Sequence, residues 1–158
     1  MHLSMTVVEA IALATAKSPM PPIVQRISAG DDTIHADLDP LEVITGSIAR
    51  LLAAAAGPIA VAARFAGFSH GVATFEVTAM ARGLPAHKLL PLLIDRVTQA
   101  IAENPAAAGI VEVRTTENDP LVLIDIQAAL DARGLSLQLT ALDLREATIF
   151  AEAAVTGS

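Results

Sequence analysis

The chain has 158 residues, of which 53% are hydrophobic and 17% are charged, and its formal net charge is −7. This composition excludes a disordered chain, and the acidic charge together with the absence of Trp and Tyr argues against nucleic acid as a partner. The length predicts a single domain spanning residues 1–158. The absence of Cys removes disulfides and thiolate chemistry and fits a reducing compartment, so we expect a cytoplasmic location.

The N-terminal segment, residues 1–16, has apolar residues at helical spacing and predicts a short amphipathic helix. Its apolar side would consist of Val8, Ile11, Ala12 and Thr15. The longest run without charge, residues 51–63, is interrupted by Gly57-Pro58 and is shorter than the roughly 20 residues that a membrane-spanning helix needs. No transmembrane segment is therefore expected.

A strand followed by a helix begins the segment 31–82. Thr33–Leu38 alternates apolar and polar residues with the period of a half-buried strand. Asp39 then occupies the position of a helix N-cap, with Pro40 at the first helical position and Glu42 three residues after the cap. These signals predict that a helix starts here.

The same segment continues with a β-hairpin. Gly57-Pro58 should end the helix. In residues 59–65 every second residue, from Ile59 to Phe65, alternates with Ala60, Ala62 and Arg64, and residues 73–79 alternate apolar and polar side chains. A turn bounded by Gly67 and Gly71 separates these two runs. We therefore predict two antiparallel strands joined at this turn.

Residues 84–103 predict a further helix, which starts near Pro85. Pro91 should kink or divide it, because proline lacks an amide donor and clashes with the preceding turn. One face of this helix would carry Leu90, Ile94, Val97 and Ile101.

The segment 110–157 has a similar order of expected elements to the segment 31–82. The two segments are therefore a candidate duplication of a β-α-β-β unit. The Asp-Pro-Leu of residues 119–121 matches that of residues 39–41. Further strands are expected at 110–114, 135–140 and 147–151. For residues 121–133 the sequence leaves two alternatives: a helix throughout, or a strand that passes into a short helix. Antiparallel hairpins with helices on one face predict the α+β class.

The polar residues offer few signals for chemistry. His35, Asp37 and Asp39 would project from one strand face and could chelate a divalent metal, but a solvated face and a helix cap explain them as well. Ser69 and His70 are adjacent and lack an identifiable third group, so they favour a solvated turn. No catalytic residue, metal site or cofactor is predicted, and the sequence favours a protein that is not an enzyme.

The aliphatic excess is the strongest functional signal, because a chain of mean hydropathy +0.56 either exposes apolar area or covers it with a ligand, a partner chain or a lipid. Our first hypothesis is a carrier or sensor of an apolar ligand, foremost a lipid, bound between sheet and helices. The second is a structural homo-oligomer that buries the same faces. The third is a small enzyme or metal-binding protein that uses His35 and Asp37, with His70 as a further candidate. The expected ligand-binding residues are Phe65, Phe75, Val77, Leu93, Ile94, Val97 and Leu137.

Four segments resemble small bacterial members of the tubular lipid-binding (TULIP) superfamily: Val24–Leu38, the hairpin at residues 67–75, the helix entry at 83–90 and the ending at 135–144. The resemblance covers about residues 24–155 and rests on hydrophobic pattern and loop placement. It implies a strongly curved antiparallel sheet that wraps around a long helix and encloses a lipid. The superfamily has no catalytic motif, so the resemblance implies no catalytic residue.

Overall fold

The structure is a computed structural model that describes residues 1–16, 24–39, 41, 57–80, 86–103, 107–117 and 119–156, with the backbone alone at 14, 86–90, 92, 93 and 100. Its elements, in chain order, are β1 (His2–Thr6), α1 (Val7–Thr15), β2 (Val24–Gly30), β3 (Thr33–Leu38), β4 (Ile59–Ser69), β5 (Val72–Met80), α4 (Ala86–Glu103), β6 (Val111–Arg114), β7 (Leu121–Asp125), α5 (Ile126–Ala132), β8 (Leu137–Arg145) and β9 (Thr148–Val155).

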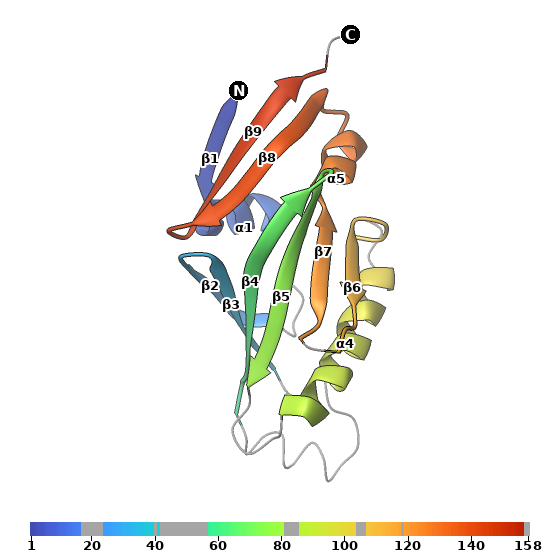
Figure 1. The fold of residues 1–158 in the computed structure, drawn as a ribbon. Coiled ribbons are helices and arrows are strands. Elements are labelled where there is room, and N and C mark those ends of the chain that lie inside the picture. The colour runs from blue at the N-terminus through green and yellow to red at the C-terminus, as the bar shows by residue number, and fades with distance from the viewer. Residues whose placement is uncertain are drawn as a thin grey trace.

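The strands form two antiparallel sheets (Figure 1). The larger sheet has six strands in the order β2-β3-β4-β5-β7-β6, and the smaller has three in the order β1-β9-β8. Every strand pairing is antiparallel, and the curved sheets stay open instead of closing into a barrel. The predicted α+β class is confirmed.

The six-stranded sheet has one apolar and one polar face. The strand register places Ala36 of β3 beside Val61 of β4, and Val61 beside Ala79 of β5. Because successive side chains along a strand point to opposite faces, the neighbouring His35 and Thr78 lie on the other face. The helix α4 packs against β5 and β6 and covers part of the apolar face (Figure 1).

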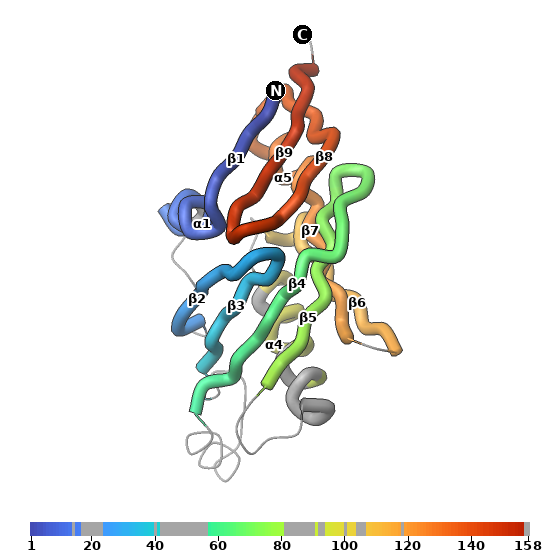
Figure 2. The backbone as a smooth tube through the Cα atoms, turned by 60° about the vertical axis from the view of Figure 1, so that its left-hand side comes forward, coloured from blue at the N-terminus to red at the C-terminus, as the bar shows by residue number. Residues whose placement is uncertain are grey.

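The three-stranded sheet is built in the same way. Leu3, Ala151 and Leu142 align across β1, β9 and β8 on one face, whereas Phe150 and Asp143 pair on the other. The helix α5 packs on the apolar side, against β8. In Figure 2, α4 and α5 both lie behind the sheets, so the two apolar faces point to the same side of the molecule.

The two sheets meet where the β2–β3 turn touches the β8–β9 turn. Asp31 accepts the backbone N–H of Ala147 at its carbonyl (3.0 Å) and that of Glu146 at its carboxylate (3.0 Å). Within the larger sheet, the carbonyl of Asp32 accepts the N–H of Phe65 in β4 at 2.8 Å, which holds the β2–β3 turn in place beside this junction. Backbone groups that would otherwise be unpaired are satisfied across this junction, which fixes one sheet beside the other.

The prediction of a helix throughout residues 1–16 is wrong in its first part, which forms β1. The helix begins at Val7 because Thr6 and Glu9 form a capping box, in which the Thr6 hydroxyl accepts the Glu9 N–H and the Glu9 carboxylate accepts the Thr6 N–H. The buried residue is Val7, with 2% exposed, whereas Val8 of the predicted apolar face is 67% exposed. Residues 2–6 pair with β9 and therefore form a strand instead of the first part of the helix.

The other expected elements agree with the structure wherever it describes them. The strand Thr33–Leu38 and the hairpin β4–β5 are confirmed, although β4 extends to Ser69 and the turn is shorter than predicted. Residues 121–133 are a strand that passes into a short helix, one of the two alternatives. The helix expected after Asp39 lies outside the described residues, apart from Leu41, whose N–H binds the Asp39 carboxylate at 3.0 Å.

The helix α4 includes Pro91 without being divided. Among the helices that the structure describes, none is both long and apolar enough to cross a bilayer. The strands β3, β4 and β5 of the first candidate repeat are neighbours in one sheet, whereas β6 to β9 of the second are shared between two sheets. The duplication itself stays a prediction.

Candidate functional site

A small apolar cavity of about 70 Å³ lies between α4 and the six-stranded sheet. It brings together Val77, Ile94 and Val97, three of the residues expected to bind a ligand. The complete lining is Leu38, Val61, Val77, Ile94, Val97, Val113, Pro120 and Val122. A cavity of this size lies well below the roughly 300–1,000 Å³ of typical ligand sites, so it is best described as a packing space under the helix.

Phe65 and Phe75 face each other across β4 and β5, on the side of the sheet that carries Val77. Their rings meet edge to face, with centroids 5.6 Å apart and planes inclined by 68°, a favourable arrangement. Both rings are half-buried, and neither belongs to the lining of the cavity under α4. The side chain of Leu93 lies outside the described part of the structure.

A larger apolar groove lies between α5 and the three-stranded sheet, with a volume of about 250 Å³; we call it the α5 groove. Its exposed lining is wholly apolar, and it contains Leu137, the remaining predicted ligand-binding residue. At its β1 side, Leu3 is 43% exposed. The groove is lined by Leu3, Ser4, Met5, Ile126, Leu130, Leu137, Leu139, Leu142, Ile149, Ala151 and Ala153.

Polar contacts at its first turn position α5 beside this groove. The Asp125 carboxylate caps the helix by accepting the Ala128 N–H at 2.9 Å. The Gln127 side chain donates to the carbonyl of Leu137 at 2.8 Å and accepts the N–H of Leu139 at 2.9 Å. Gln127 therefore satisfies backbone groups at the edge of β8 and holds one wall of the groove against the other.

Gly71 supports the same helix from the β4–β5 turn. Its carbonyl accepts the N–H groups of Ile126 and Gln127, at 3.0 and 3.2 Å. Gly71 adopts a φ of +81°, and a Cβ added there would lie 2.7 Å from the Cβ of Gln127. Glycine is required at this position both for its backbone conformation and for the close approach of α5.

Sequence reasoning missed most of the α5 groove. The helix predicted for residues 1–16 misplaces Leu3 and Met5, and residues 121–125 stay open between helix and strand, although both alternatives include a helix where α5 lies. The alternation of His2, Ser4 and Thr6 with Leu3 and Met5 is a strand signal that could have identified β1.

The polar candidates do not converge. His35 and Asp37 lie on the polar face of β3, whereas His70 lies in the β4–β5 turn, eight positions along the chain from Ala62, the partner of His35. At about 3.3 Å per residue the backbones of His35 and His70 are roughly 25 Å apart. The described residues contain no group of three His, Asp or Glu side chains that could hold a metal ion.

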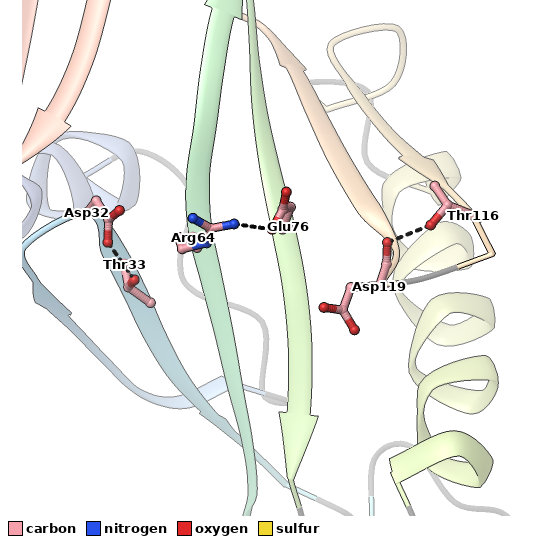
Figure 3. Close-up of polar contacts among 6 residues, drawn as sticks. All are labelled: Asp32, Thr33, Arg64, Glu76, Thr116 and Asp119. Carbon is pink, nitrogen blue, oxygen red and sulfur yellow. Dashed lines mark hydrogen bonds and ion pairs between the residues drawn. The ribbon is translucent and has the colours of Figure 1, made fainter.

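The polar face of the six-stranded sheet carries an ion pair between Arg64 and Glu76, which are directly opposite on β4 and β5 (Figure 3). The hydrogen bond and charge of Glu76, with a smaller effect of Asp32, raise the pKa of Arg64 above its ordinary value. The guanidinium therefore stays charged; Arg64 is exposed and Glu76 is half-buried. Such a pair near the surface contributes little to stability.

The face opposite the α5 groove carries mixed polar contacts. The Arg145 guanidinium lies 4.5 Å from the ring centroid of Phe150, and His2 lies 3.4 Å from Glu152. These residues line a shallow, mixed cavity of about 350 Å³. Their charged groups are engaged with each other on an exposed surface, so this face has no built binding site.

Comparison of the chain with models of protein families, with curated proteins and with solved structures finds no match.

Proposed function

We propose that the protein binds an apolar ligand, foremost the acyl chain of a lipid, in the α5 groove. The observation that carries this proposal is a groove of about 250 Å³ whose exposed lining is wholly apolar, a volume just below the roughly 300–1,000 Å³ of typical ligand sites. Water in such a groove finds few hydrogen-bond partners, so its replacement by hydrocarbon is favourable. The cavity under α4 is the weaker candidate because its volume is about 70 Å³.

The distribution of burial supports the same proposal. The chain is 53% hydrophobic, but few of the described apolar side chains are fully buried. They are Val7, Leu38, Ile59, Ala73, Ala79, Leu144 and Ala153. Much of the aliphatic surface is thus left half-exposed, and a ligand that covers it would gain about 25 cal/mol for each Å² removed from water. The resemblance to tubular lipid-binding proteins and the cytoplasmic location stand as parts of this proposal, the latter supported by the lack of Cys.

The test is titration with a fluorescent polyene fatty acid, whose emission rises in an apolar site. Ala151 lines the groove and is half-buried, so Ala151→Phe should fill the space and weaken binding by about tenfold or more. Ala154 of the same strand is exposed and is not part of the groove lining, so Ala154→Phe is the matched control and should bind as the parent does.

Thermal unfolding of both variants would show that the fold is kept. Lack of binding by the parent protein, or equal binding by the Ala151→Phe variant, would contradict the proposal. Weaker binding in Ala154→Phe alone would place the ligand on the opposite face of the sheet.

A further inference from the structure

The strand β1 forms a free edge of the three-stranded sheet. It pairs with β9 on one side, and on the other side only α1, which follows β1 directly, lies near its lower end (Figures 1 and 2). Four of its five residues are exposed, and Met5 is half-buried. The outer backbone groups of such a strand can pair with a further strand.

The contacts with β9 show which groups are available. Met1 and Ala153 exchange two backbone hydrogen bonds, of 2.9 and 3.0 Å. In an antiparallel pair, bonded and non-bonded positions alternate, so Leu3 also points its N–H and C=O toward β9. The backbone groups of His2 and Ser4 then point outward, away from the sheet.

The other free edges carry features that discourage pairing. β2 has a register irregularity beside the exposed, charged Arg26, and β6 is four residues long with Glu112 and Arg114. β8, the opposite edge of the three-stranded sheet, packs beside β4, and its backbone already bonds the Gln127 side chain at Leu137 and Leu139. The sequence of β1, HLSMT, has no Lys, Arg, Asp, Glu, Pro or Gly. Of the described edges, β1 is therefore the one suited to strand addition.

We propose that β1 pairs antiparallel with β1 of a second copy of this chain, about a twofold axis beside Leu3. His2 of each copy would exchange two backbone hydrogen bonds with Ser4 of the other, four in all. Leu3 would face its own counterpart as a non-bonded pair, the closer of the two pair types, with Cα atoms about 4.5 Å apart. The two three-stranded sheets would join into one sheet of six strands.

A contact in the turn after β1 selects this register. An axis beside Ser4 would pair Thr6 with His2 of the other copy, but the Thr6 N–H already donates to the Glu9 carboxylate at 3.1 Å. That donor is engaged in the capping box, so the alternative register would lose hydrogen bonds or break the cap. The axis beside Leu3 uses His2 and Ser4 alone.

Charge and exposure favour a second copy as the occupant. Each chain carries a net charge of −7, so most pairings of its surface with itself place acidic groups together. The edge of β1 has no acidic residue, and its exposed apolar residue, Leu3, would be covered by its own counterpart. This inference does not depend on ligand binding, although the two α5 grooves would lie on the same face of the joined sheet.

The test measures the mass of untagged protein by native mass spectrometry and light scattering over a dilution series. Ser4→Pro removes the outward donor and leaves the β9 ladder intact, so it should weaken the dimer by about a hundredfold, about tenfold for each of the two hydrogen bonds lost. Ser4→Ala keeps the donor and is the matched control, which should form dimers as the parent does.

Circular dichroism should show the same fold in both variants. If Ser4→Pro fails to fold, Leu3→Glu replaces it: two carboxylates would meet at the axis, giving a monomer at neutral pH and a dimer again in acid. A parent protein that stays monomeric at high concentration, or one that carries a discrete foreign polypeptide in place of a second copy, overturns the proposal. Unchanged dimerisation in Ser4→Pro or in Leu3→Glu overturns it equally.

Discussion

The two sheets have apolar faces of the same kind but are covered by helices of very different length. The six-stranded sheet is covered by α4, which has 18 residues, and the three-stranded sheet by α5, which has 7. At 1.5 Å per residue these helices span about 27 and about 10 Å. The cavity under the long helix is about 70 Å³ and the groove beside the short one about 250 Å³. The short helix α5 thus leaves a larger apolar space beside it, which a ligand would need.

A helix as short as α5 depends on specific contacts for its position. In isolation a helix of this length is unstable, because the cost of nucleation is not recovered over so few residues. The hydrogen bonds of Gln127 with β8, and those of the Gly71 carbonyl with the first turn of α5, stabilise the helix in its position. Single substitutions at these backbone contacts should therefore lower the free energy of unfolding more on the side of the three-stranded sheet than on the side of the six-stranded sheet.

The largest effect is expected for Gly71→Ala. The new Cβ would lie 2.7 Å from the Cβ of Gln127, and the φ of +81° is unfavourable for alanine. Together these should lower the free energy of unfolding by about 2–4 kcal/mol. Gly109→Ala is the matched control: its φ is also +81°, but its added Cβ meets nothing within 4 Å, so it should cost about 1 kcal/mol. Urea unfolding measures both, and equal losses would contradict a specific clash with α5.

A smaller difference is expected between two isoleucines, one under each helix. Ile94 of α4 and Ile126 of α5 are both half-buried and line the small cavity and the groove, respectively. Ile94→Ala should cost about 2–3 kcal/mol because it enlarges an otherwise packed space. Ile126→Ala should cost about 1 kcal/mol, since its side chain already borders an open groove. An equal or reversed order in urea unfolding would show that the groove is as tightly packed as the cavity.

The sequence predicted the six-stranded sheet better than the three-stranded one. Thr33–Leu38 and the hairpin after Gly57 show clean alternation and a turn bounded by glycine, and both signals depend on near neighbours in the chain. These signals also placed Val77 on the apolar face, opposite α4. Where α4 is described, the spacing of Ile94 and Val97 was equally informative, because both side chains line the same cavity.

In the three-stranded sheet, the strands expected at 135–140 and 147–151 correspond to β8 and β9, whereas β1 was not predicted because its partner lies at the other end of the chain. β1 pairs with β9, so the stability of residues 2–6 as a strand comes from a partner about 150 positions away. Residues 2–6 are too few for a local pattern to distinguish a strand from the start of a helix, and the pairing with β9 decides between them. The walls of the α5 groove come from β1, α5, β8 and β9. Local sequence patterns do not predict this groove, because its walls come from distant parts of the chain.

The smallest expected effect is a pH dependence at the start of α1, next to β1. The backbone and side-chain hydrogen bonds from Thr6 lower the pKa of Glu9 below its ordinary value of 4.5. A lowered pKa in the folded state means that the cap contributes fully above pH 4.5 and is lost as the pH falls through the lower, folded-state pKa. The amide NMR signals of Thr6 and Glu9 should report this change.

The Glu9→Gln variant is the control, because its side-chain oxygen still accepts the Thr6 N–H and has no charge to lose. Its Thr6 amide should therefore not shift over the same acid range. Titration of the Thr6 amide in the parent protein at or above pH 4.5 would contradict the capping contact. In the proposed β1 pair, the bond from the Thr6 N–H to Glu9 disfavours the alternative register, so acid should weaken the preference for one register before it destabilises either sheet.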